Sequence, residues 1–297
     1  MAVQEQDDLI TRAQAWLAED PDPETAAELA KLVEASDDAE AAAELADRFS
    51  GTLQFGTAGL RGEIGAGPMR MNRSVVIRAA AGLAAYLKAR GHAGGLVVVG
   101  YDARYKSADF ARDTAAVMTG AGLRAAVLPR PLPTPVLAYA IRHLGAVAGV
   151  EVTASHNPPR DNGYKVYLGD GSQIVSPADV EIAAEIERVD TLASVPRPES
   201  GWEDLGDEVL EAYLARTDAV LTPGSPGACG PSTRPCTASA RTSSWRPSRG
   251  PASRSRCWSP SRPSRTRPSR QWPSRTRKSR ARWTWRSRRP PRPSPTS

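Results

Sequence analysis

The chain has 297 residues and a formal net charge of +6, but this total averages two unlike parts. Residues 1–223 carry 20 Lys and Arg against 33 Asp and Glu, a charge of −13, whereas residues 224–297 carry 19 Lys and Arg and no acidic residue, a charge of +19. The second part also lacks Leu, Ile, Val, Met and Phe, so it cannot bury enough aliphatic surface to fold alone, and we predict a disordered basic tail there.

The first part has no features of a secreted or membrane protein. Its first 20 residues are acidic and contain no apolar core, which argues against a secretory signal. No apolar run approaches the roughly 20 residues that span a bilayer. All three cysteines lie in the tail (Cys229, Cys236 and Cys257), which argues against a disulfide framework or a thiolate metal site in the first part. We therefore predict a cytoplasmic protein with no membrane partner.

The N-terminal region is helical in character. Residues 5–18 carry apolar side chains at helical spacing, Pro23 and Glu24 suit a helix start, and residues 35–49 are rich in Ala and Glu. We predict a helical extension over residues 1–47 with no chemistry of its own.

Helices and strands then alternate at short spacing. Apolar periodicity and continuous aliphatic runs predict helices over 75–90, 107–120, 133–144, 177–189 and 207–220, and strands over 96–102, 124–129, 146–154 and 163–167. This order predicts an α/β domain built on a parallel sheet that helices cover.

Two loops at the carboxyl ends of the predicted strands are candidates for the chemistry, because α/β sheets bind ligands at that edge. They are residues 102–106 and 155–162. In the second loop, Ser155 stands next to His156 and Asn157, and two prolines stiffen the turn that follows. A serine presented in this way can act as a nucleophile or carry a phosphate, but taken alone a Ser-His-Asn loop is more often ordinary turn chemistry.

Four motifs decide between these readings. TASHNPPRDNGYKVY (153–167) resembles the active-site serine loop of the α-D-phosphohexomutases, the phosphoglucomutase/phosphomannomutase family. FGTAGLRGEIGAGPMRMN (55–72), GYDARYKS (100–107) and PTPVLAYAIRHLGAVAGVEVTASHNP (133–158) are similar to family motifs in the same order, and 55–72 has the form found in the longer, phosphoglucomutase-like branch.

The resemblance implies a fold, a division into domains and an activity. It implies a first domain with a mixed, largely parallel sheet over residues 48–205, the start of a second domain at 206–223, and a tail at 224–297. The implied activity is that of an isomerase, an intramolecular phosphotransferase that interconverts hexose 1-phosphate and hexose 6-phosphate. The hexose phosphate substrate would pass through a bound hexose 1,6-bisphosphate.

The resemblance also implies roles for particular residues. Ser155 would be the phosphoserine, and a cationic surround is expected for phosphoryl transfer. Arg61 and Lys165 are the candidates for that charge, and His156 would transfer a proton or orient the loop. Weaker candidates for phosphate or substrate binding are Arg104 and Asn157. For each cation, the alternative is a solvated loop side chain.

A metal ion is implied as well. Family members hold Mg²⁺ between an oxygen of the phosphoserine, here Ser155, and three aspartates of a D-x-D-x-D-R loop in the second domain. That loop and the later sugar-binding loops are missing from this sequence. We therefore expect little mutase activity from the chain as written, and the choice between glucose and mannose stays open.

The tail has a further reading. Its repeated Ser, Arg, Pro and Trp are typical of a GC-rich gene read in the wrong frame. A shifted frame permits LRTVYTPLHGVG and TVAFPNPEEPGAMDLA, which resemble stretches of the family's second domain. We therefore expect a frameshift near residues 224–228. Two other hypotheses remain: a nucleic-acid-binding protein that uses the basic tail, for which we expect only non-specific polyanion binding, and a non-catalytic remnant that binds a phosphosugar.

Overall fold

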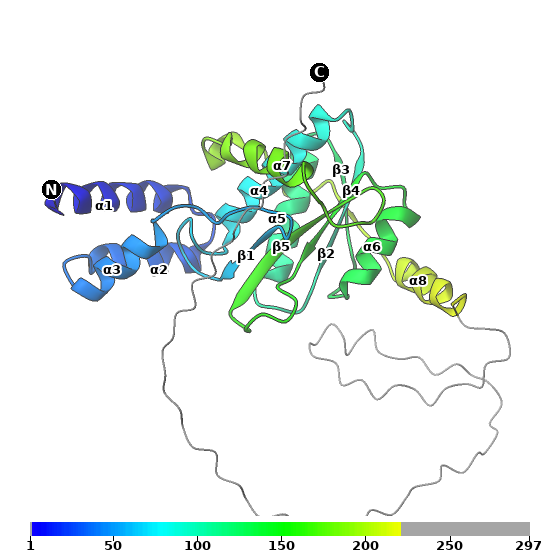
Figure 1. Cartoon of the computed structure of the whole chain (residues 1–297), viewed down its shortest axis with the longest axis horizontal. Coiled ribbons are helices and arrows are strands. Elements are labelled where there is room, and N and C mark those ends of the chain that lie inside the picture. Colours follow the sequence, from blue (N-terminus) through cyan, green and yellow to red (C-terminus); the bar gives the residue numbers. More distant parts are fainter. Residues whose placement is uncertain (1, 221–297) are drawn as a thin grey trace, which may run out of the picture. The chain divides into compact units, whose positions relative to one another are not determined.

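The computed structural model describes residues 2–220 of the chain (Figure 1). The predictions of a basic tail and a shifted frame beyond residue 223 lie outside the described residues. The helices are α1 (Ala2–Glu19), α2 (Pro23–Glu34), α3 (Ala39–Arg48), α4 (Arg73–Ala89), α5 (Ser107–Gly120), α6 (Thr134–His143), α7 (Ala178–Glu187) and α8 (Glu208–Asp218), with a 3₁₀ turn at Leu192–Ser194. The strands are β1 (Leu60–Glu63), β2 (Leu96–Tyr101), β3 (Arg124–Val127), β4 (Ala148–Val152), β5 (Asp161–Leu168) and β6 (Glu203–Asp204).

The strands form one sheet in the order β1-β5-β4-β2-β3-β6. Strand β2 pairs in parallel with β3 and β4, and β3 pairs in parallel with β6. Strand β5 is antiparallel to both of its neighbours, β4 and β1. The predicted α/β class with a mixed, largely parallel sheet is therefore confirmed.

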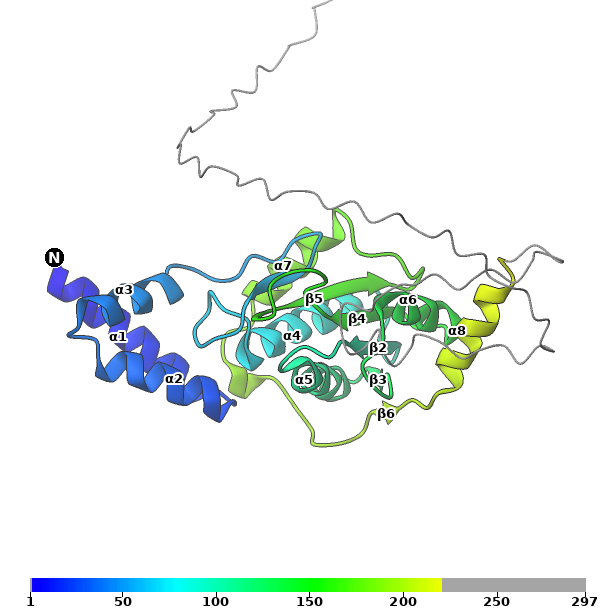
Figure 2. The same cartoon turned by 90° about the horizontal axis from the view of Figure 1, so that it is seen from below.

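Helices cover both faces of the sheet (Figures 1 and 2). Val97 and Val99 of β2 join the core cluster that also contains Leu83 of α4. Between them, Val98 joins the cluster on the other face, with Leu137 of α6. Because successive side chains of a strand point to opposite faces, burial on both sides explains the unbroken aliphatic run of β2.

Most of the predicted elements are present with small shifts at their ends. Helix α5 has the predicted bounds, whereas the strand predicted over 124–129 ends at Val127. We did not predict β1 or β6. Strand β1 has the sequence LRGE and buries only Leu60 well, so its extended form depends on pairing with β5.

The first three helices pack around a small core of their own. Its buried members are Ala13, Leu29, Leu45, Phe49 and Ala66, the last of which comes from the segment after β1. Asp22 caps the start of α2 and Asp38 caps the start of α3, each with its carboxylate accepting from backbone N–H groups. We call α1–α3 the helical extension; its predicted boundary at residue 47 stays a prediction. None of the helices within residues 2–220 is both long and apolar enough to cross a bilayer.

Candidate active site

The loop between β4 and β5 presents Ser155 to solvent. Val152 and Ala154 are buried, whereas Ser155 and His156 are exposed. Ser155 has a φ of 57°, in the left-handed region that residues other than glycine seldom occupy. Such a conformation costs about 1–3 kcal/mol and is concentrated at functional sites, so the surrounding contacts must hold it. We call residues 153–161 the serine loop.

A buried carboxylate is hydrogen-bonded to this loop. Asp102, directly after β2, accepts hydrogen bonds from Thr153 Oγ1 at 2.7 Å and Ser107 Oγ at 2.8 Å. Thr153 Oγ1 in turn accepts from the backbone N–H of Ser155 at 3.0 Å. The two loops predicted to hold the chemistry therefore meet, and a chain of hydrogen bonds joins Asp102 to the backbone of Ser155.

Arg104 joins the same two loops more extensively. Its guanidinium donates to four backbone carbonyl oxygens, those of Ser155, Asn157, Pro158 and Asp161. The side chain is only 10% exposed. The sequence predicted a weak role for Arg104 in phosphate binding, which stays a prediction; the guanidinium lies beneath the loop and contacts its backbone.

The hydroxyl of Ser155 lies beside an imidazole, a group with acid–base capacity. Its Oγ lies 3.3 Å from Nδ1 of His156. Beyond the histidine, Asn157 accepts a hydrogen bond from Arg61 at 3.4 Å and donates one to Asp161 at 2.8 Å. Since β1 pairs with β5, the strand pairing brings Arg61 to the serine loop across 96 residues of sequence.

Lys165 lies on β5, half-buried, directly across the ladder from Glu151 of β4. Burial lowers the pKa of the Lys165 ammonium, and the positive charge of Arg61 lowers it further, while the carboxylates of Glu151 and Asp102 act in the opposite direction. The two predicted cations, Lys165 and Arg61, are therefore close enough to influence one another. Their predicted role in charge neutralisation is compatible with this placement and stays a prediction.

Sequence reasoning missed Glu151. Its side chain is 1% exposed, and neither carboxylate oxygen has a hydrogen-bond partner among residues 2–220. Burial, followed by the charge of Asp102, raises the pKa of the Glu151 carboxyl well above its usual value, and Lys165 offsets this only in part. The signal was available, because a single acid interrupts the aliphatic run AVAGVEVTA (146–154).

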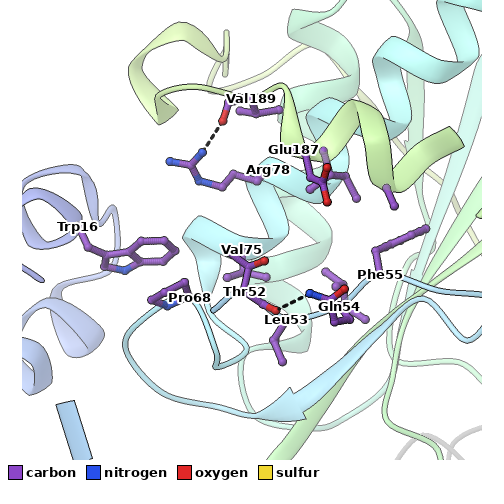
Figure 3. Close-up of a pocket in the computed structure, with 13 residues that line it drawn as sticks. Trp16, Thr52, Leu53, Gln54, Phe55, Pro68, Val75, Arg78, Glu187 and Val189 are labelled. Atoms are coloured by element: carbon purple, nitrogen blue, oxygen red, sulfur yellow. Dashed lines mark hydrogen bonds between the residues drawn. The ribbon is translucent and has the colours of Figure 1, made fainter. Parts of the chain in front are cut away.

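Two of the cavities that the helical extension helps to line differ in their relation to the serine loop. One, of about 280 Å³, is mainly apolar and is lined by Trp16, Leu53, Phe55, Val75, Arg78 and Ile186 among others (Figure 3). None of its lining residues is a predicted site residue or belongs to the serine loop, although Leu60 directly precedes Arg61. The other, of about 400 Å³, is lined by Pro159 and Arg160 of the serine loop and by Glu24 and Lys106. The candidate active site lies at the serine loop, away from the apolar cavity.

The donors around Ser155 do not make a magnesium site by themselves. Asp102 is the buried carboxylate hydrogen-bonded to the serine loop, and it already accepts from Thr153, Ser107 and the backbone of Arg104. Within residues 2–220 no three His, Cys, Asp or Glu side chains gather in a way that could hold a metal ion. The predicted Mg²⁺ would need several oxygen ligands, so further carboxylates would have to come from outside the described residues.

Comparison with known proteins places the serine loop in a family. Residues 52–193 match the model of the phosphoglucomutase/phosphomannomutase α/β/α domain I. A protein of Haemophilus influenzae named "Probable phosphomannomutase" is 55% identical over 154 residues, which cover 50% of this chain and 31% of that protein. The domain described above, residues 52–193, therefore belongs to the α-D-phosphohexomutase family.

Other relatives are more distant. The phosphoribomutase of Saccharomyces cerevisiae is 42% identical over 183 residues, covering 61% of this chain and 29% of the yeast protein. A solved structure of a phosphoglucomutase/phosphomannomutase family protein from Burkholderia thailandensis aligns with a TM-score of 0.45 and 23% identity, over 56% of this chain and 35% of that one. The chain thus spans about a third of the length of the curated relatives it matches.

Proposed function

We propose that this chain carries the phosphoserine domain of a phosphosugar mutase, with Ser155 as the residue that holds the phosphoryl group. One observation carries the proposal: in a segment that matches domain I of this family, the hydroxyl of Ser155 is exposed on a strained, well-supported turn at the end of a buried strand. An ordinary surface turn has no need for a left-handed serine.

The residues around Ser155 suit phosphoryl transfer. When Ser155 Oγ attacks a phosphoryl group of a sugar bisphosphate, an Oγ–P bond forms and the bond from phosphorus to the sugar oxygen breaks. His156 Nδ1, at 3.3 Å, would accept the hydroxyl proton, and the leaving sugar oxygen would take up one proton from solvent. In the reverse step, His156 returns the proton to Ser155 Oγ. Lys165 and Arg61 would balance the charge on the phosphoryl oxygens.

The proposed substrates are hexose 1- and 6-phosphates, which exchange through a hexose 1,6-bisphosphate. A pentose phosphate is the competing substrate class, because one relative is a phosphoribomutase. We propose Mg²⁺ as the cofactor, held by the phosphate on Ser155 together with carboxylates from outside residues 2–220.

The experiment is a labelling assay with glucose 1,6-bisphosphate and Mg²⁺, read by the intact mass of the protein and by mapping of the phosphopeptide. We expect one phosphoryl group on Ser155, none in Ser155→Ala, and normal labelling in Ser172→Ala, which removes an exposed serine from the turn after β5. If the chain stays unlabelled, the same assay is run on the product of the shifted frame. An unlabelled Ser155 in that product would refute the proposal.

A further inference from the structure

The two terminal nitrogens of the Arg104 guanidinium are saturated by the backbone of the serine loop, whereas its Nε–H makes no hydrogen bond within residues 2–220. One terminal nitrogen donates to the carbonyl oxygens of Pro158 at 2.7 Å and Asp161 at 3.0 Å. The other donates to those of Ser155 at 3.0 Å and Asn157 at 2.8 Å. The two terminal nitrogens carry four N–H groups in all, and each has an acceptor. A phosphate could bind these atoms only if the loop released one of them.

Asp102 fixes the arginine in turn. The backbone N–H of Arg104 donates to Asp102 Oδ1 at 2.9 Å, and Arg104 Nε lies 3.3 Å from Asp102 Oδ2. The same carboxylate holds Thr153, which accepts from the N–H of Ser155. Asp102 and Arg104 therefore hold both sides of the serine's peptide backbone: its N–H through Thr153 and its carbonyl directly.

Only arginine can make this set of contacts. Three of the four carbonyls, those of Ser155, Asn157 and Pro158, lie outside the strand ladders, and two prolines remove two backbone donors from this loop. The guanidinium supplies planar, diverging, charged donors, and charge-assisted hydrogen bonds are stronger than neutral ones. A lysine at the same position has a single nitrogen and cannot span four carbonyls.

We propose that Arg104 is a positioning residue that holds the serine loop in its strained conformation, so that the hydroxyl of Ser155 is presented before any substrate binds. The consequence for phosphoryl transfer rests on the proposed function. The consequence for the loop does not, since it follows from the four carbonyl contacts alone.

The first test measures the loop itself in the unphosphorylated chain. We expect faster amide hydrogen exchange in peptides covering residues 153–163 in Arg104→Ala and Arg104→Lys. Arg160→Ala is the matched control, because Arg160 stands in the same loop with its side chain 83% exposed. Addition of methylguanidinium should slow the exchange again in Arg104→Ala only. Unchanged exchange in both Arg104 variants would overturn the proposal, whether or not Ser155 accepts a phosphoryl group.

The second test separates positioning from direct phosphate binding. In the labelling assay, a positioning residue should change the rate of transfer to Ser155 and leave the KM for glucose 1,6-bisphosphate nearly unchanged. We expect the rate to fall about 100-fold in Arg104→Lys, the loss typical of a misplaced reacting group. A KM that rises in Arg104→Lys at an unchanged rate would instead assign Arg104 to the phosphate and refute positioning. If Ser155 is labelled neither in this chain nor in the product of the shifted frame, the proposed function fails and the exchange result stands alone.

Discussion

Replacement of Glu151 by Gln should stabilise the protein at neutral and alkaline pH. The carboxylate is buried between β2 and β5 without a hydrogen-bond partner among residues 2–220. It lies across the backbone of Gly100, where an added Cβ would stand 2.3 Å from Glu151 Oε2. The charged groups that act on it are Asp102 and Lys165, and it in turn acts on the titratable hydroxyl of Tyr167. A negative charge in this position is costly because water is excluded and only Lys165 opposes it.

The sign of the pH dependence follows from the direction of the pKa shift. The pKa of Glu151 is raised in the folded protein, so above its usual value of 4.5 the folded state binds more protons than the unfolded state. The contribution of the protonated Glu151 carboxyl to the free energy of unfolding is therefore fully present below pH 4.5, and it is lost as the pH rises through the folded pKa. Because Gln cannot ionise, the variant should lose no free energy of unfolding from this position as the pH rises above 4.5.

The size of the effect follows from the unpaired group. An unsatisfied buried polar group costs about 1–3 kcal/mol, and a charged one more. For a domain of this size, 1 kcal/mol corresponds to roughly 2–4 °C in Tm. We expect Glu151→Gln to melt like the wild type at pH 4.5 and several degrees higher at pH 8.

Thermal unfolding followed by circular dichroism at several pH values tests this expectation. Glu199→Gln, an exposed glutamate, is the control and should stay within about 0.5 kcal/mol of the wild type throughout. A Glu151→Gln variant that melts below the wild type at pH 8 would refute the reasoning, because it would mean that Lys165 satisfies an ionised Glu151. In the variant, Lys165 also loses a carboxylate that raises its pKa.

Two further changes have clear expectations. Gly163→Ala should lower the free energy of unfolding by about 1–3 kcal/mol, because the added Cβ would meet two backbone oxygens at 2.7 and 2.9 Å. The control is Gly56→Ala, whose added Cβ would meet no atom within 4 Å. Equal losses of stability for the two variants in urea unfolding would count against this cause. Asp22→Ala should cost about 1–3 kcal/mol and speed hydrogen exchange in residues 102–107, because the helix cap and the ion pair to Lys106 are lost together. Asp38→Ala, which removes only a cap, should leave those residues unchanged; if both variants leave them unchanged, the ion pair does not hold the loop.

The sequence predicted the four consecutive strands β5, β4, β2 and β3, because burial on two faces leaves a local signature. Strand β2 and helix α5 could be assigned from neighbouring residues alone. Strand β1 could not, since LRGE is extended only through its pairing with β5. The same difference applies to the site. The motifs indicated which residues to consider, but a four-carbonyl contact by Arg104 is a tertiary property that no spacing within GYDARYKS expresses.

The helical extension also contacts the loop after β2; the expectation that it has no chemistry of its own stays a prediction. Lys106, the residue before α5, has a φ of 62° and an ammonium held 2.9 Å from Asp22 and 3.1 Å from Glu24. Burial alone would lower the pKa of Lys106, but the hydrogen bonds to these two carboxylates outweigh it and raise the pKa, so the cation stays charged. Lys106 lies two residues from Arg104, and both hold the loop after β2 in place. The left-handed residue Lys106 is therefore held by the carboxylates of Asp22 and Glu24. The left-handed residue Ser155 is held in a similar way by Arg104, which donates to its carbonyl oxygen.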